Sequence, residues 1–165
     1  MRQQIRKRVY IETTIVSYLT AKPSRDLIMA AHQEITREWW EHERGAFELR
    51  VSQFVLDEAG DGDPEAVTRR LAALQGIPVL ADSPDARVLA KALVDQGLLP
   101  KIAGIDALHL AMATVHEVHV VMTWNCRHLA NAAILGELGE FVRAKGYNMP
   151  TVCTPEELMG NRYAE

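Results

Sequence analysis

The chain has 165 residues, of which 48% are hydrophobic and 24% charged, and its formal net charge at pH 7 is −4. This length predicts a single domain over residues 1–165, and such a chain can bury most of its apolar surface. The negative charge argues against a protein that binds nucleic acid tightly and without sequence preference, although acidic catalytic residues would themselves lower the total.

The first residues of the chain and its cysteines indicate where in the cell the protein is expected. The segment Met1–Arg8 is basic but has neither an apolar region nor a small-residue cleavage site, so it does not have the pattern of a secretory signal. No apolar run approaches the roughly 20 residues that span a membrane. Cys126 and Cys153 form no CxxC pair and no zinc-ligand spacing, which favours free thiols in a reducing compartment. We therefore expect a cytoplasmic protein with no membrane association.

The first half of the chain alternates short apolar runs with amphipathic segments. An apolar run predicts a strand over residues 8–12, followed by a short helix over 13–19. Ser24 is the predicted cap of a longer helix that ends near Gly45. A strand at 49–52 leads into a short helix through Glu58, and Asp63 caps a further helix through residue 74. The apolar stripe of the longer helix is predicted to be Leu27, Ile28, Ala31, Ile35 and Trp39.

The second half continues this alternation. Residues 77–80 predict a short strand, which Pro78 places at the edge of a sheet. Helices are expected from Pro84 to near Gly97, over 101–116 and over 127–145, with strands at 118–123 and 151–153. Thr154 to Glu157 has the sequence of a capping box. The inward-facing residues of the helix that begins at Pro84 are predicted to be Val88, Leu89, Ala92 and Leu93.

Strands that alternate with helices, several of them apolar throughout, predict an α/β protein with a mainly parallel central sheet. In such sheets ligands bind beyond the carboxyl ends of the strands. Glu12 and Asn125 both come directly after predicted strands. They therefore lie where a site is expected.

Three carboxylates stand out because of their surroundings. Glu12 ends an apolar strand, Glu58 ends a mostly apolar helix, and Asp106 is embedded near the start of the apolar helix Ile105–Ala113. Carboxylates about 4 Å apart repel by about 4 kcal/mol at an effective dielectric of about 20, so a cluster of them needs protons or a cation. Oxygen ligands favour Mg²⁺ or Mn²⁺, and a water activated by such an ion can hydrolyse a phosphodiester.

The order of these motifs resembles the PIN-domain family, which includes the VapC-type ribonuclease toxins. The resemblance rests on Tyr10–Thr14, on Ser52 with Glu58 six residues later, on Asp106–Ala111 and on Thr123–Asn125, and it covers about residues 8–153. It implies a three-layer α/β/α sandwich and an Mg²⁺- or Mn²⁺-dependent ribonuclease that cuts RNA. It also implies a homodimer and, for a toxin, a small antitoxin encoded beside it.

The resemblance also implies roles for residues of this chain. Glu12 stands where the family usually has aspartate, Glu58 and Asp106 match its central acids, and Asn125 replaces the aspartate of its Thr-x-Asp motif. Glu12, Asp106 and Glu58 would hold the metal, and Asn125 would complete the catalytic set. Two roles stay open for Asn125, a site residue or a cap for the following helix. Predicted substrate contacts come from Thr14, Thr123, Trp124, Arg127 and His109.

Two other functions stay open at this point. A neutral Asn125 would suit a PIN fold that has lost cleavage and acts as a nucleic-acid-binding or regulatory protein. The same acids would also suit a metal-dependent phosphatase that acts on small molecules.

Overall fold

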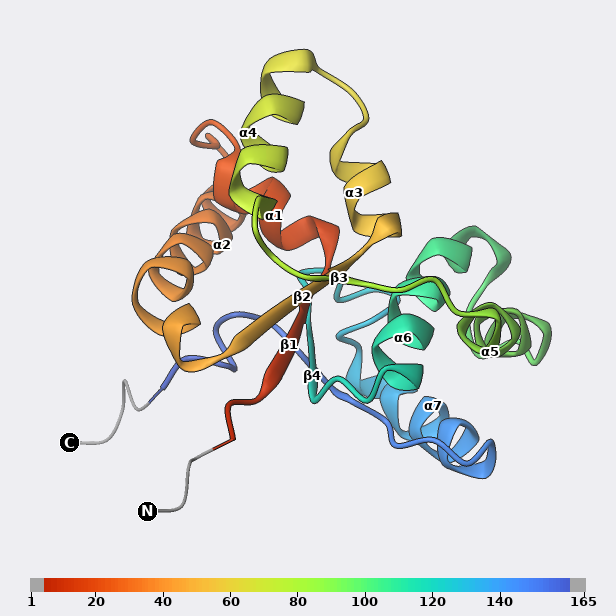
Figure 1. Ribbon diagram of the computed structural model, residues 1–165. Coiled ribbons are helices and arrows are strands. Elements are labelled where there is room, and N and C mark those ends of the chain that lie inside the picture. The colour runs from red at the N-terminus through yellow and green to blue at the C-terminus, as the bar shows by residue number, and fades with distance from the viewer. Residues whose placement is uncertain (1–4, 161–165) are drawn as a thin grey trace.

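The computed structural model describes residues 5–160, which form an α/β fold with a five-stranded sheet (Figure 1). The strands are β1 (Arg8–Ile11), β2 (Glu48–Ser52), β3 (Val79–Leu80), β4 (Val120–Met122) and β5 (Thr151–Cys153). The α-helices are α1 (Thr13–Thr20), α2 (Leu27–Glu38), α3 (Gln53–Ala59), α4 (Pro64–Leu74), α5 (Pro84–Asp95), α6 (Gly104–Val115) and α7 (Ala132–Ala144). A π-helical turn (Trp39–Glu43) and two 3₁₀ turns (Arg44–Ala46 and Lys101–Ala103) complete the described elements.

The sheet has the strand order β3-β2-β1-β4-β5, and all four pairings are parallel. The order reverses direction at β1, which pairs with β2 on one side and β4 on the other. The carboxyl ends of β1 and β4 therefore diverge at the switch point where open parallel sheets bind ligands. The predicted parallel sheet and the edge position of the strand after Pro78 are confirmed.

Helices cover both faces of this sheet, as parallel strands require. In Figure 1, α1 and α2 lie to one side of the sheet and α5, α6 and α7 to the other. The central strands are buried, with Val9, Tyr10 and Ile11 of β1 and Val121 and Met122 of β4 each 0% exposed. Such apolar strands are stable only between two layers, so the core forms on both faces of the sheet.

The predicted apolar stripe of α2 is wrong for its first half. Leu27 is 87% exposed and Ile28 70% exposed, whereas Gln33 and Thr36 are buried. Asp26, not Ser24, caps this helix, because its carboxylate accepts a hydrogen bond from the backbone N–H of Met29 at 2.8 Å. The helix therefore starts two residues later than predicted, and its buried face carries the polar residues Gln33 and Thr36.

Other boundaries also differ from those predicted. Val88 was expected in the core but is 69% exposed, while Leu89 beside it is 3% exposed. The helix expected from residue 127 begins at Ala132, because Asn131 caps it and the preceding residues form a turn. The capping box holds Thr154 and Glu157 together across a turn, and the described residues that follow, up to residue 160, form no helix.

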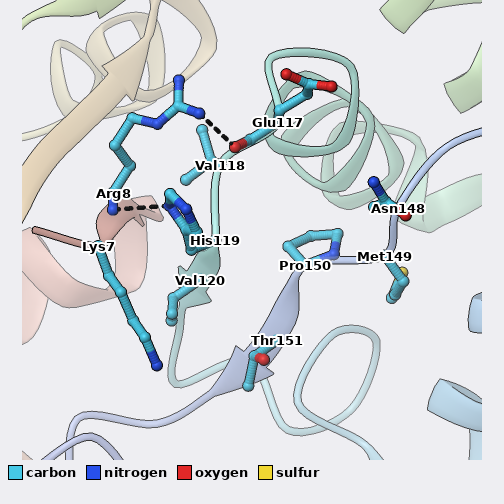
Figure 2. Close-up of a pocket in the computed structure, with 10 residues that line it drawn as sticks. All are labelled: Lys7, Arg8, Glu117, Val118, His119, Val120, Asn148, Met149, Pro150 and Thr151. Carbon is cyan, nitrogen blue, oxygen red and sulfur yellow. Dashed lines mark hydrogen bonds between the residues drawn. The ribbon is translucent and has the colours of Figure 1, made fainter. Parts of the chain in front are cut away.

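The amino ends of β1, β4 and β5 border a hollow of about 500 Å³ (Figure 2). There the backbone N–H of Arg8 donates to His119 Nδ1 at 3.0 Å, and the Arg8 guanidinium donates to the carbonyl of Glu117 at 2.8 Å. Figure 2 shows both contacts. They tie β1 to the segment between α6 and β4, at the edge of the sheet opposite the carboxyl ends of the strands.

Among the described residues, no helix is both long and apolar enough to cross a membrane.

Candidate metal site

Glu12 occupies the carboxyl end of β1, where it caps α1. Its side chain is only 3% exposed. Oε2 accepts hydrogen bonds from the backbone N–H of Thr14 at 3.1 Å, from the Thr14 hydroxyl, and from the Thr123 hydroxyl at 2.7 Å. These three donors satisfy one carboxylate oxygen of a nearly buried charge. Among the described residues, no hydrogen bond engages Oε1, which leaves that oxygen for a further ligand.

Glu58 reaches the same edge from α3. Its Oε2 accepts a hydrogen bond from the Thr13 hydroxyl at 2.6 Å and lies 2.6 Å from His109 Nε2. Burial alone would raise the pKa of Glu58, but the hydrogen bonds from His109 and Thr13 outweigh it and lower the pKa below its usual value. Glu58 is therefore a carboxylate at neutral pH.

These side chains converge on one small volume. One carboxylate oxygen from each of Glu12 and Glu58 and one ring nitrogen of His109 all lie within 4.8 Å of one another. Two carboxylates this close repel each other, and a divalent cation would remove that repulsion. An oxygen-rich donor set suits Mg²⁺ or Mn²⁺. The residues present thus fit the metal that the sequence predicted.

Asp106 lies in the first turn of α6, one turn before His109. Residues three apart share a helix face, so Asp106 points to the same side of α6 as His109. Its Oδ2 is 3.1 Å from His128 Nδ1, and the side chain is 12% exposed. Among the described residues it does not belong to the group within 4.8 Å. A place for Asp106 among the metal ligands remains a prediction.

Asn125 holds the turn that carries His128. Its Oδ1 accepts from the backbone N–H of Arg127 at 3.2 Å and from that of His128 at 3.0 Å. The cap role left open by the sequence is therefore present, although it serves this turn, while Asn131 caps the helix that follows. Through the turn, Asn125 fixes the position of His128 beside Asp106.

Replacing Asn125 with alanine is expected to lower the free energy of unfolding by about 1 kcal/mol, because two backbone N–H groups lose their acceptor. Asn125→Asp keeps a carbonyl-type oxygen at the same place and is the matched control, with stability close to wild type. Urea unfolding of the two variants checks this. If Asn125→Ala were as stable as Asn125→Asp, the side-chain oxygen would contribute nothing to the turn.

The predicted substrate residues other than His109, which lies against Glu58, fall into three groups. The hydroxyls of Thr14 and Thr123 bond to Glu12, so both support that carboxylate. Arg127 is exposed on the turn beside the site. Trp124 is only 8% exposed, with its ring stacked on His32 at 4.0 Å and its Nε1 donating to Thr36 at 2.7 Å. Because its ring is already covered, we do not retain Trp124 among the residues that would contact the substrate.

Sequence reasoning gave no site role to two residues that the structure places against the acids. Thr13 donates to Glu58, and His128 contacts Asp106. The signal for His128 was its position three residues after Asn125, the spacing of an Asn cap to the backbone N–H it holds.

A hollow of about 400 Å³ opens beside the two glutamates. Its walls come from α1, α2 and α3, and Met29 and Tyr18 contribute apolar surface. A ligand or a partner side chain could reach the carboxylates by this route. The residues that line it are Glu12, Thr13, Thr14, Ser17, Tyr18, Ala21, Met29, Gln33 and Glu58.

A parallel sheet of order 3-2-1-4-5 with acidic residues at its switch point defines a PIN-like α/β fold, as the sequence resemblance predicted. The chain matches VapBC2 from Rickettsia felis, solved bound to a DNA fragment from their promoter, with a TM-score of 0.55 and 15% identity over 89% of this chain and 98% of that chain. It matches FitAcB from Neisseria gonorrhoeae with a TM-score of 0.52 and 16% identity, over 90% of this chain and 98% of that chain. At these identities the likeness establishes the fold alone. No protein-family model matches the sequence, and comparison with curated proteins gives no significant match.

Proposed function

We propose that this chain is an Mg²⁺- or Mn²⁺-dependent endoribonuclease that hydrolyses RNA phosphodiester bonds. The observation that carries the proposal is the convergence of Glu12 and Glu58 at the carboxyl edge of the sheet, with ligand atoms of both within 4.8 Å of each other and of His109. The PIN-like fold supports it, because this edge is the switch point of the sheet.

Each side chain has a proposed role. Glu12 offers Oε1 to the cation while the two threonine hydroxyls keep Oε2 in place. Glu58 and Asp106 complete the acidic set, and Asn125 holds the turn at its rim. A bound Mg²⁺ or Mn²⁺ supplies the positive charge that stabilises phosphate oxygens and activates water. Arg127, exposed on that turn, is placed to contact the RNA backbone.

Cleavage of a labelled RNA pool with Mn²⁺, and again with EDTA, tests this function. We expect fragments with Mn²⁺ and none with EDTA. Turnover of p-nitrophenyl phosphate without RNA cleavage would support the small-molecule phosphatase instead. Intact RNA at millimolar Mn²⁺, with RNA binding retained, would favour a PIN fold that binds without cutting. The neutral Asn125, whose oxygen is already used in the turn, is the observation that favours this second candidate.

We also propose that a small antitoxin, encoded beside this gene, covers the site. Leu27, Ile28 and Met29 are 87%, 70% and 43% exposed at the start of α2, and Met29 also lines the hollow beside the glutamates. Solvent-exposed apolar residues grouped on one turn are typical of an interface. The homodimer expected from the resemblance stays a prediction, which light scattering of the purified protein would test.

The paired substitution Leu27→Asp and Ile28→Asp is expected to reduce co-purification of the neighbouring gene product by at least about 10-fold, because charges would be buried against an apolar surface. Val79→Asp is the matched control, since Val79 is 47% exposed on the edge strand β3. Equal capture by all three proteins would place the interface elsewhere.

A further inference from the structure

A chain of hydrogen bonds runs behind the two glutamates, through the core. The Tyr10 hydroxyl lies 2.6 Å from Ser52 Oγ and 2.7 Å from His109 Nδ1. His109 Nε2 in turn lies 2.6 Å from Glu58 Oε2. Tyr10, Ser52 and His109 are each 0% exposed, so water does not compete for these contacts.

The chemistry of the groups at its two ends determines which atom donates in each of these hydrogen bonds. At neutral pH Glu58 is a carboxylate, whose oxygens can only accept, and its Oε2 already accepts from the Thr13 hydroxyl at 2.6 Å. The nitrogen that faces it, His109 Nε2, must therefore carry a hydrogen. In a neutral ring Nδ1 is then bare and accepts from the nearest donor, which is the Tyr10 hydroxyl at 2.7 Å.

Tyr10 is a donor because a phenol keeps its hydrogen at neutral pH. Its one hydrogen goes to His109, so its oxygen accepts the hydrogen of Ser52 at 2.6 Å. Every group in the series Ser52, Tyr10, His109 and Glu58 then has a partner, as buried polar groups require. The reverse direction would leave two acceptors facing each other at Glu58.

We propose that Ser52 and Tyr10 hold His109 as an Nε2–H donor to Glu58, which makes His109 a positioning residue for that carboxylate. A nitrogen that carries a hydrogen has no lone pair for a metal, so His109 is not itself a ligand. The cation is held by carboxylate oxygens, and His109 aims one of them, as groups behind metal ligands commonly do. This inference rests on the proposed metal-dependent function.

Long-range ¹H–¹⁵N NMR of histidine-labelled protein at pH 8 reads the hydrogen directly, before and after Mg²⁺ is added. His109 is assigned among the six histidines as the signal missing from His109→Gln. We expect a pyrrole-type Nε2 and a pyridine-type Nδ1, with and without Mg²⁺. A pyridine-type Nε2 in either state would overturn the inference, and so would two pyrrole-type nitrogens.

Tyr10→Phe removes the donor to Nδ1 and is expected to mix the two tautomers and to weaken Mg²⁺ binding by about 10-fold. Ser52→Ala should change the tautomer populations of His109 in the same direction but to a smaller extent. It replaces Tyr10→Phe as the test if Tyr10→Phe does not fold. Tyr147→Phe, a half-buried tyrosine after α7, is the matched control and should leave both readouts unchanged. An unchanged tautomer in both Tyr10→Phe and Ser52→Ala would also overturn the inference.

The two proposals fail separately. The tautomer in the metal-free protein needs neither metal nor RNA, so a correct tautomer without cleavage would end only the proposed nuclease. Metal-dependent cleavage with the opposite tautomer would end only the positioning role inferred for His109.

Discussion

Asp106→Asn is expected to reduce metal-dependent RNA cleavage by about 100- to 1,000-fold, the loss seen when one group that stabilises transition-state charge is removed. The substitution removes a charge from the acidic set while keeping the size of the side chain. An amide can still contact His128, so the fold should persist. Initial rates on a labelled RNA at saturating Mn²⁺ measure the effect.

Asp85→Asn is the matched control for this substitution. Asp85 lies in the first turn of α5 as Asp106 lies in the first turn of α6, so both variants lose a similar interaction with the helix dipole. Asp85 is exposed and lines a different hollow from the one that holds the two glutamates, so its variant should cleave at the wild-type rate. If Asp106→Asn cleaved within about twofold of Asp85→Asn, Asp106 would have no part in the site.

Leu89→Ala is expected to lower the free energy of unfolding by about 2–5 kcal/mol, because it leaves a cavity in the core beside α6. Leu89 is 3% exposed on α5. The neighbouring Val88 is 69% exposed, so Val88→Ala should change stability by no more than about 0.5 kcal/mol. Urea unfolding with a common slope compares the two variants.

This pair of variants tests the structure against the sequence pattern, because the pattern placed both Val88 and Leu89 in the core. Similar losses in the two variants would mean that α5 is rotated from the orientation described. A large loss of stability in Val88→Ala alone would mean that the buried and exposed faces of α5 are the reverse of those described.

The strands could be predicted because their signal is local. An apolar run such as Val9–Ile11 is stable only when buried on both faces, so it indicates a parallel sheet wherever it occurs. A helix cap could also be predicted from local sequence. Asp63 caps α4 through the backbone N–H of Ala66, as its position before proline predicted.

The faces of the helices were harder to predict, because several apolar residues of α2 are not in the core. Leu27 and Ile28 fit a helical stripe, yet they are exposed while Gln33 and Thr36 are buried. Those polar side chains bond to the backbone, Gln33 to Lys22 and Ser24, and Thr36 to His32. The Gln33 partners lie 9 and 11 residues away in the chain, and a periodic pattern gives no sign of them.

In the candidate site, too, some features have a local sequence signal and others depend on partners far apart in the chain. Glu12 and Glu58 could be predicted from their positions at the ends of elements, and the structure brings them together. The link from Tyr10 to His109 joins residues 99 positions apart, so only the fold reveals it. Tyr10 looked like an ordinary strand residue, and its hydroxyl gave no local sign of a partner.

Anomalous diffraction from crystals soaked in Mn²⁺ tests the central claim most directly. We expect one strong manganese peak between the carboxylates of Glu12, Glu58 and Asp106, with no nitrogen of His109 among its ligands. A peak bound elsewhere on the chain, or no peak at millimolar Mn²⁺, would contradict the account.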